Sequence, residues 1–414
     1  MKAISSRRSS IPDVCRRTTK TCAAVLLILF LLFSVRTYAE TGTGDGADSA
    51  ADEQIEAEFE RMLGETDLSA WQRYFDELTS YPGFSGYGSA EELLTELASG
   101  RTAGMAGPKL FGEKLLQLFM PGVGEALRKL AFAACAAVLT GLVSIVLDNS
   151  GLKKLALLLI GGVVILSAAA VFSSIAADAS DLVSQIADFS EAATPVLGLL
   201  LTAMGCSASA KLLTPKLAFI AGGAAAFIRT VIVPMLLASG VMTVLNGLSD
   251  RMKLDRLIKL LSRTAKWLLG LLTAVFTAVT VASGIAASAA DGVTLRTARY
   301  AVDKLIPAVG GMVTGAVDAV RSAALLLKNG AGLTALLLLA ALLIRPLLTI
   351  AANILAFRLT AAVCEPFSDP RIPAMLDGIA DTVSLLFACA AAAAAMLAVT
   401  LVVMISAGGA LAGA

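Results

Sequence analysis

Long apolar runs, separated by short polar segments, dominate the chain after residue 128. Because about 20 consecutive apolar residues suffice to cross the hydrocarbon core of a bilayer, these runs predict an all-α polytopic membrane domain over residues 128–414. The expected spans are Leu130–Leu147, Leu155–Ile175, Leu217–Val244, Trp267–Ala289, Leu333–Val363 and Val383–Ile405.

Two of these runs are longer than one straight crossing requires, and each contains an arginine close to a proline. Arg229 is followed by Pro234, and Arg345 is followed directly by Pro346. Proline removes a helical hydrogen bond, so we expect both helices to be kinked or broken there. A charge in the middle of a bilayer normally faces protein or water, which places both arginines in the interior. The alternative is that each arginine snorkels from a long, tilted helix.

Weak internal similarity relates two halves of the membrane domain, residues 194–290 and 306–410. Thr194–Gly205 aligns with Ile306–Val317 through a shared Pro, Gly and Thr, and the Ile-Arg dipeptide of each long run follows. The pattern predicts an internal repeat with broken or re-entrant helices. In transporters the functional site lies at the interface between such repeats.

The segment 291–332 is too charged for a lipid-facing span and too apolar for an ordinary loop. Gly311 and Gly315 form a small-xxx-small pattern that permits close helix packing. Asp318 and Arg321 are three residues apart, so they are neighbours on a helix and can neutralise each other. We therefore expect a packed element inside the bundle, with an amphipathic interfacial helix as the alternative. Asp291 and Arg296 are further candidate intramembrane charges.

The amino-terminal region reads as a signal followed by an acidic segment. Residues 1–39 combine a basic start, an apolar core and a small-residue cleavage site, as in a secretory signal peptide; an uncleaved anchor is the alternative. Residues 40–127 are predicted to be extracytoplasmic, partly disordered and partly helical. The segment from Glu40 to Ser99 contains fifteen acidic residues and only two basic ones, both arginines. A solvated spacer and a docking surface both fit this composition.

The distribution of basic residues predicts the orientation of the bundle. The segment Arg251–Lys266 is strongly basic, so the positive-inside rule places it in the cytoplasm. The acidic segment Ala177–Pro195 is then expected to be an outside loop. If the basic segment lies inside and the acidic segment outside, Pro195–Ala210 must not cross the membrane.

Composition argues against catalysis. The chain is 57% hydrophobic, well above the roughly 45–50% of a soluble domain, and has no histidine, the commonest general base and metal ligand. The cysteines are scattered without a CxxC spacing, and no nucleotide-binding loop is present. We expect no enzymatic activity, no cofactor, no metal site and no nucleic-acid partner.

The phrases "DGVTLRTARYAVDKLIPAVGGMVTGAVDAVRSAALLLKNGAG", "PVLGLLLTAMG" and "FIRTVIVPMLL" resemble the stage III sporulation protein AE family of endospore-forming bacteria. The resemblance extends over roughly residues 190–410. It implies a multi-pass protein of the mother-cell membrane around the engulfed forespore. No catalytic residues are defined for that family, so none is carried over.

The resemblance also implies partners. They are other membrane and ring-forming proteins of a secretion-like channel complex, a secretion-type ATPase, the surrounding lipid bilayer and, indirectly, a forespore membrane protein. A secondary transporter of a small solute and a purely structural scaffold for the rings are the alternative functions.

Overall fold

The computed structural model is helical throughout the part that it describes. That part comprises residues 57–64, 69–79, 121–131, 150–203, 222–248, 254–305, 310–366 and 370–406, with isolated residues between them. The chain divides into two compact units, Met1–Gly46 and Ala47–Ala414, and every described residue belongs to the second. The predicted signal peptide and most of the predicted span 130–147 therefore lie outside the described residues.

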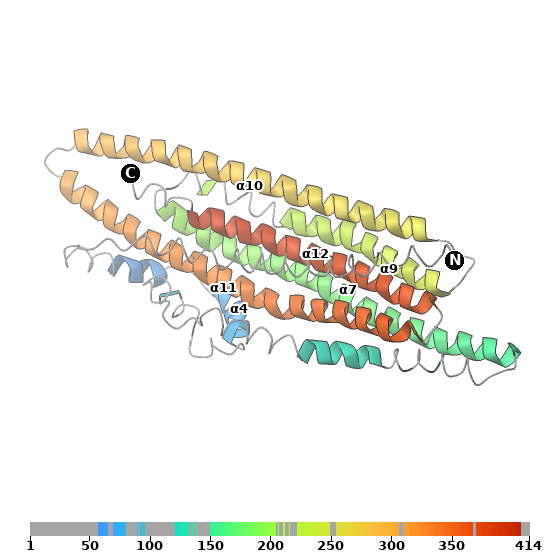
Figure 1. Ribbon diagram of the computed structural model, residues 1–414. Helices are drawn as coiled ribbons and strands as arrows, with labels where there is room; N and C mark the ends of the chain where they lie inside the picture. The colour runs from blue at the N-terminus through green and yellow to red at the C-terminus, as the bar shows by residue number, and fades with distance from the viewer. Residues whose placement is uncertain are drawn as a thin grey trace. The chain divides into compact units, whose positions relative to one another are not determined.

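Helices of very different length make up the described part of the second unit (Figure 1). They are α4 (Ser69–Thr79), α7 (Ser150–Ala203), the π-helix η1 (Ile228–Ile232), α9 (Val233–Leu248), α10 (Asp255–Leu305), α11 (Gly310–Cys364) and α12 (Arg371–Ser406). In the described residues four helical segments are long and apolar enough to cross a membrane: Leu159–Ala203, Gly222–Gly247, Ser322–Cys364 and Arg371–Ile405. The expected membrane-type, all-helical architecture is confirmed at this level.

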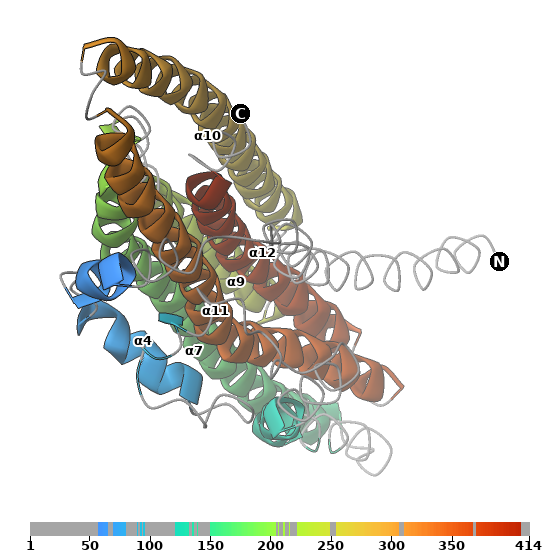
Figure 2. The same cartoon turned by 90° about the vertical axis from the view of Figure 1, so that its left-hand side faces the viewer.

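Helix α12 lies at the centre of the bundle and packs against α7, α9, α10 and α11 (Figures 1 and 2). Short connections join α9 to α10, α10 to α11, and α11 to α12, so consecutive helices run antiparallel. One end of the bundle, which we call the hairpin end, therefore contains the α9–α10 and α11–α12 connections. The opposite end contains the end of α7 at Ala203 and the start of α11.

Polar side chains hold the α9–α10 hairpin together. The Asn246 side chain donates from Nδ2 to Asp255 (3.0 Å) and accepts at Oδ1 from the backbone N–H of Leu254 (3.3 Å). Farther along, the hydroxyls of Ser239 and Ser262 lie 2.9 Å apart. These hydrogen bonds fix the geometry of the connection between α9 and α10.

Close helix contacts depend on glycines. A Cβ at Gly240 of α9 would collide with the ring of Phe172 on α7, and a Cβ at Gly378 of α12 would lie 2.6 Å from Cγ2 of Thr243 on α9. Small residues at crossings let membrane helices approach closely. These two contacts fix the relative heights of α7, α9 and α12.

The acidic segment 177–195 is not a loop, which corrects the sequence-based expectation. It belongs to α7, which continues without interruption to Ala203. The physical reason lies in its spacing, because apolar residues recur three or four positions apart and are buried on one helix face. These residues are Ile175, Ala179, Leu182, Val183, Ile186 and Phe189. The expected short, non-crossing element that begins near Pro195 is correspondingly the last part of α7.

The two prolines beside arginines behave differently. Before Pro234 the helix widens into η1, in which the Val233 N–H bonds to the carbonyl of Ile228, five residues earlier. The wider turn accommodates the proline ring, which would clash with the carbonyl of Thr230 in a regular helix. At Pro346, in contrast, α11 continues as an α-helix from Gly310 to Cys364. The expected break at Pro346 is therefore wrong.

The segment 291–332 is not one structural element. Residues 291–305 end α10, and residues 310–332 begin α11. The structure does not show the internal repeat at these two segments. Thr194–Ala203 ends a helix, whereas residues 310–317 begin one. No re-entrant helix is seen among the described helices.

Candidate functional site

One face of α7 is strongly polar. Ser174, Asp178, Asp181, Gln185 and Asp188 are all exposed. They follow one another at intervals of four, three, four and three residues, so they form a single stripe on the helix. We call this stripe the polar face of α7.

The polar face of α7 lies at the same height as the apolar part of α12. Ile186 of α7 lines a small apolar cavity together with Met396 and Thr400 of α12, and the exposed Gln185 and Asp188 flank Ile186. Carboxylates are costly against lipid and in membrane proteins normally face protein or water. The polar face is therefore unsuited to contact acyl chains, whereas it can line water or meet another subunit.

Helix α4 packs against both α11 and α7 (Figure 2). The fully buried Trp71 donates its indole N–H to the carbonyl of Ala192 (3.2 Å). The Tyr74 ring meets that of Phe189 edge to face at a centroid distance of 4.9 Å, and Phe75 is 1% exposed. Helix α4 is therefore packed against the bundle of its own chain and is not a solvated spacer, whereas a docking surface for a partner stays a prediction.

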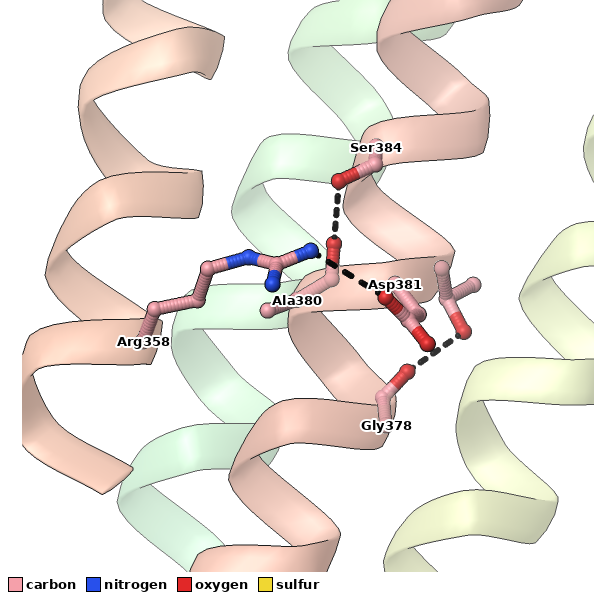
Figure 3. Close-up of polar contacts among 6 residues, drawn as sticks. Arg358, Gly378, Ala380, Asp381 and Ser384 are labelled. Atoms are coloured by element: carbon pink, nitrogen blue, oxygen red, sulfur yellow. Dashed lines mark hydrogen bonds and ion pairs between the residues drawn. The ribbon is translucent and has the colours of Figure 1, made fainter. Parts of the chain in front are cut away.

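An ion pair joins α11 to α12 near the hairpin end (Figure 3). The Arg358 guanidinium reaches a carboxylate oxygen of Asp381 at 3.2 Å. The arginine side chain is 15% exposed and the aspartate side chain 56%. One Arg358 nitrogen, Nε, is buried without a hydrogen-bond partner among the described residues. The guanidinium is thus largely withdrawn from solvent and depends on one exposed partner.

A buried lysine joins the same two helices at the other end. The Lys328 side chain is among the largest fully buried ones, and its Nζ donates to the backbone carbonyl of Ile405 (2.8 Å). Ile405 lies in the last turn of α12, where carbonyls have no helical partner. Lys328 therefore caps α12. The sequence analysis assigned Lys328 no role, because its acceptor lies 77 positions away along the chain.

The two arginines of the long apolar runs are both exposed on this chain, which corrects the expectation that they face its interior. Arg229 lies in η1, and π-helical turns occur frequently at functional sites. Arg345 lies near residues 121–131. There a hydrogen bond from Lys129 lowers the pKa of Glu125, and the charges of Lys129, Arg128 and Arg345 lower it further.

The remaining predicted site residues fall where the structure describes only the backbone. Asp291 and Arg296 belong to the last turns of α10. Gly311, Gly315, Asp318 and Arg321 belong to the first turns of α11. The proposed pairing of Asp318 with Arg321 therefore stays a prediction.

Among the described residues no group of three or more acidic or cysteine side chains is arranged to hold a metal ion. Within the same part of the chain Cys206, Cys364 and Cys389 are buried, Cys135 is exposed, and none of them forms a disulfide.

Comparison with known proteins identifies the family. The family profile described as stage III sporulation protein AE matches residues 90–408. The curated stage III sporulation protein AE of Bacillus subtilis (strain 168) is 29% identical over 230 residues, which cover 56% of this chain and 58% of that relative. No solved structure matches the chain. Because the profile spans well over half of its length, the chain belongs to the stage III sporulation protein AE family.

Proposed function

We propose that this protein is a non-enzymatic membrane component of a secretion-like channel complex that links mother cell and forespore during endospore formation. In this proposal the protein resides in the mother-cell membrane and contributes the polar face of α7 to a hydrophilic path. Family membership supports the role in sporulation. The polar face at the height of an apolar helix is the observation that favours a path over a passive support.

The two ends of the bundle suggest different partners in this proposal. Helix α4, which belongs to the acidic region, packs at Ala192 in the last part of α7, toward the end opposite the hairpin end. Ring-forming proteins on the extracytoplasmic side would bind there. The hairpin end carries the basic first turns of α10, which the positive-inside rule assigns to the cytoplasm. A secretion-type ATPase would act at that end.

Two rival functions make different demands on the polar face. A scaffold for the rings would need no water along it. A self-contained transporter of a small solute would transport that solute without the other proteins of the complex. The channel proposal requires both water access and the partners.

Cysteine accessibility tests the channel proposal. Gln185→Cys would be compared with Leu166→Cys, an exposed apolar position on the same helix whose side chain is 73% exposed. Both variants would carry alanine at Cys15, Cys22 and Cys135. In membranes that contain the assembled complex, a membrane-impermeant thiol reagent should modify position 185 and not position 166. Equal protection of both positions would count against a water-lined face.

Bulky substitutions then test whether the path is used. Gln185→Trp should reduce late forespore gene expression and spore yield while protein level and complex assembly stay normal, since the side chain would narrow the path. Leu166→Trp, at an exposed apolar position of α7 outside the stripe, is the matched control. Normal spore yield with Gln185→Trp would favour the scaffold. Solute transport by the purified protein alone in liposomes would favour the transporter.

A further inference from the structure

An open apolar groove of about 1050 Å³ runs between α10 and α12. Its α10 wall consists largely of small residues one turn apart: Gly270, Ala274, Ala278 and Ala282. Its α12 wall includes Ala388 and Ala392. The volume is at the upper end of the roughly 300–1,000 Å³ typical of small-molecule sites.

No described side chain fills the groove at Gly270. A Cβ at Gly270 would meet no atom within 4 Å. The two threonine hydroxyls along the wall are already used within α10, because Thr273 donates to the carbonyl of Leu269 (2.9 Å) and Thr277 to that of Thr273 (2.8 Å). An occupant therefore meets a surface that is almost entirely apolar.

One end of the groove is cationic. Lys266 lines it there, and Trp267 beside it is 64% exposed. No described carboxylate lies within ion-pairing distance of Lys266. Arg263, also exposed, is one turn away. Tryptophan and basic residues together are typical of the level of lipid headgroups.

We infer that this groove binds an anionic glycerophospholipid, with an acyl chain along the small residues of α10 and α12 and the headgroup phosphate at Lys266. Charge complementarity is the reason for choosing an anionic lipid as the occupant. An acyl chain matches the apolar walls, and a phosphate matches the Lys266 ammonium, which pairs with none of the described carboxylates, as in the basic pockets between membrane helices that bind anionic lipids. A partner's transmembrane helix would fill the small-residue wall equally well, but it leaves the lysine without a designated counter-charge.

A lipid bound in the groove would also stabilise the packing of α10 against α12. Among its described side chains, which lie in 255–283, only Ala265, Phe276, Thr280 and Ser283 are buried, and more than half are exposed. A lipid seated between α10 and α12 adds apolar contact where the two helices are separated. The inference concerns the isolated protein and does not depend on the proposed channel.

The test uses the purified full-length protein in detergent, with phosphatidylglycerol and phosphatidylcholine of identical acyl chains as probes and native mass spectrometry as the readout. Wild-type protein should retain phosphatidylglycerol in preference to phosphatidylcholine. Gly270→Leu places a bulky side chain in the groove, where its Cβ meets nothing within 4 Å, and should lower phosphatidylglycerol affinity about tenfold or more. Gly162→Leu on α7, where a Cβ also meets open space, is the matched control and should bind normally.

A second pair of variants tests the headgroup contact. Lys266→Gln should lower phosphatidylglycerol affinity about fivefold, the size expected for one partly exposed ion pair, and leave phosphatidylcholine binding unchanged. Arg256→Gln, an exposed cation of α10 that does not line the groove, should change neither. Equal binding of the two lipids by wild type, or unchanged binding in Gly270→Leu, would overturn the inference. So would crosslinking of Ala274→Cys to a protein partner in native membranes, because a helix would then occupy the groove.

Discussion

Replacing Trp71 with alanine should release α4 from the bundle. The side chain is 0% exposed and contributes both its ring and an N–H bond to Ala192. Removal of a buried Trp or Phe side chain typically costs about 3–5 kcal/mol. Helix α4 has only 11 residues, and isolated helices shorter than about 12–15 residues are marginal in water. Docking, not intrinsic helix stability, must therefore keep α4 folded.

The magnitude follows from these two facts. If undocking and unfolding of α4 are one event, a loss of about 3–5 kcal/mol raises the open fraction by about two to four orders of magnitude. Hydrogen exchange of residues 69–79, followed by mass spectrometry on the full chain in detergent, measures that fraction directly. Exchange in α12 should stay unchanged, because the core of the bundle does not depend on α4.

Two further variants separate the ring from its hydrogen bond. Trp71→Phe keeps most of the buried ring and loses the bond to Ala192, so it should cost about 1 kcal/mol and speed exchange about fivefold. Trp267→Ala removes the chain's other tryptophan, which is 64% exposed, and should leave α4 protected. If Trp71→Ala left exchange in residues 69–79 at the wild-type rate, the docking would not depend on this side chain and the reasoning would fail.

Other contacts give further predictions. Gly240→Ala should lower the thermal midpoint in detergent by the equivalent of about 1–3 kcal/mol, because its Cβ would collide with Phe172; an unchanged midpoint would mean that the ring yields freely. Lys328→Met should leave the Ile405 carbonyl without its cap, at a cost of about 1–3 kcal/mol, and speed hydrogen exchange in the last turn of α12; unchanged exchange there would contradict a capping role. Asp381→Ala should destabilise more than Arg358→Met, because only the former leaves a largely buried guanidinium without its carboxylate. Equal midpoints in those two variants would show that the pair is solvated.

The apolar runs predicted much of the fold because length and composition suffice to identify a spanning helix. The runs that became α9, α11 and α12 were predicted to end close to the observed helix ends, but α11 and α12 begin well before the predicted starts, at Gly310 and Arg371. Helix α7 was cut short because the acids of segment 177–195 suggested a loop. Its buried residues nevertheless keep helical spacing, so a stricter test of periodicity would have predicted the continuous helix.

The candidate site was harder to predict, for a physical reason. Periodicity shows that one face of a helix is apolar, but it does not show what covers that face. The sequence therefore gave no partner for the aromatic residues of α4, and the contact of Trp71 with Ala192, 121 positions away, required the fold. The same holds for Lys328, whose acceptor lies 77 positions away.

The unbroken length of the principal helices has a mechanical consequence. Helices α7, α10 and α11 contain 54, 51 and 55 residues, which at about 1.5 Å per residue makes each roughly 80 Å long, whereas a bilayer core is about 30 Å thick. A strut of this kind transmits tilt instead of absorbing it. A tilt imposed on these helices at the hairpin end would therefore displace the opposite end of the bundle as well.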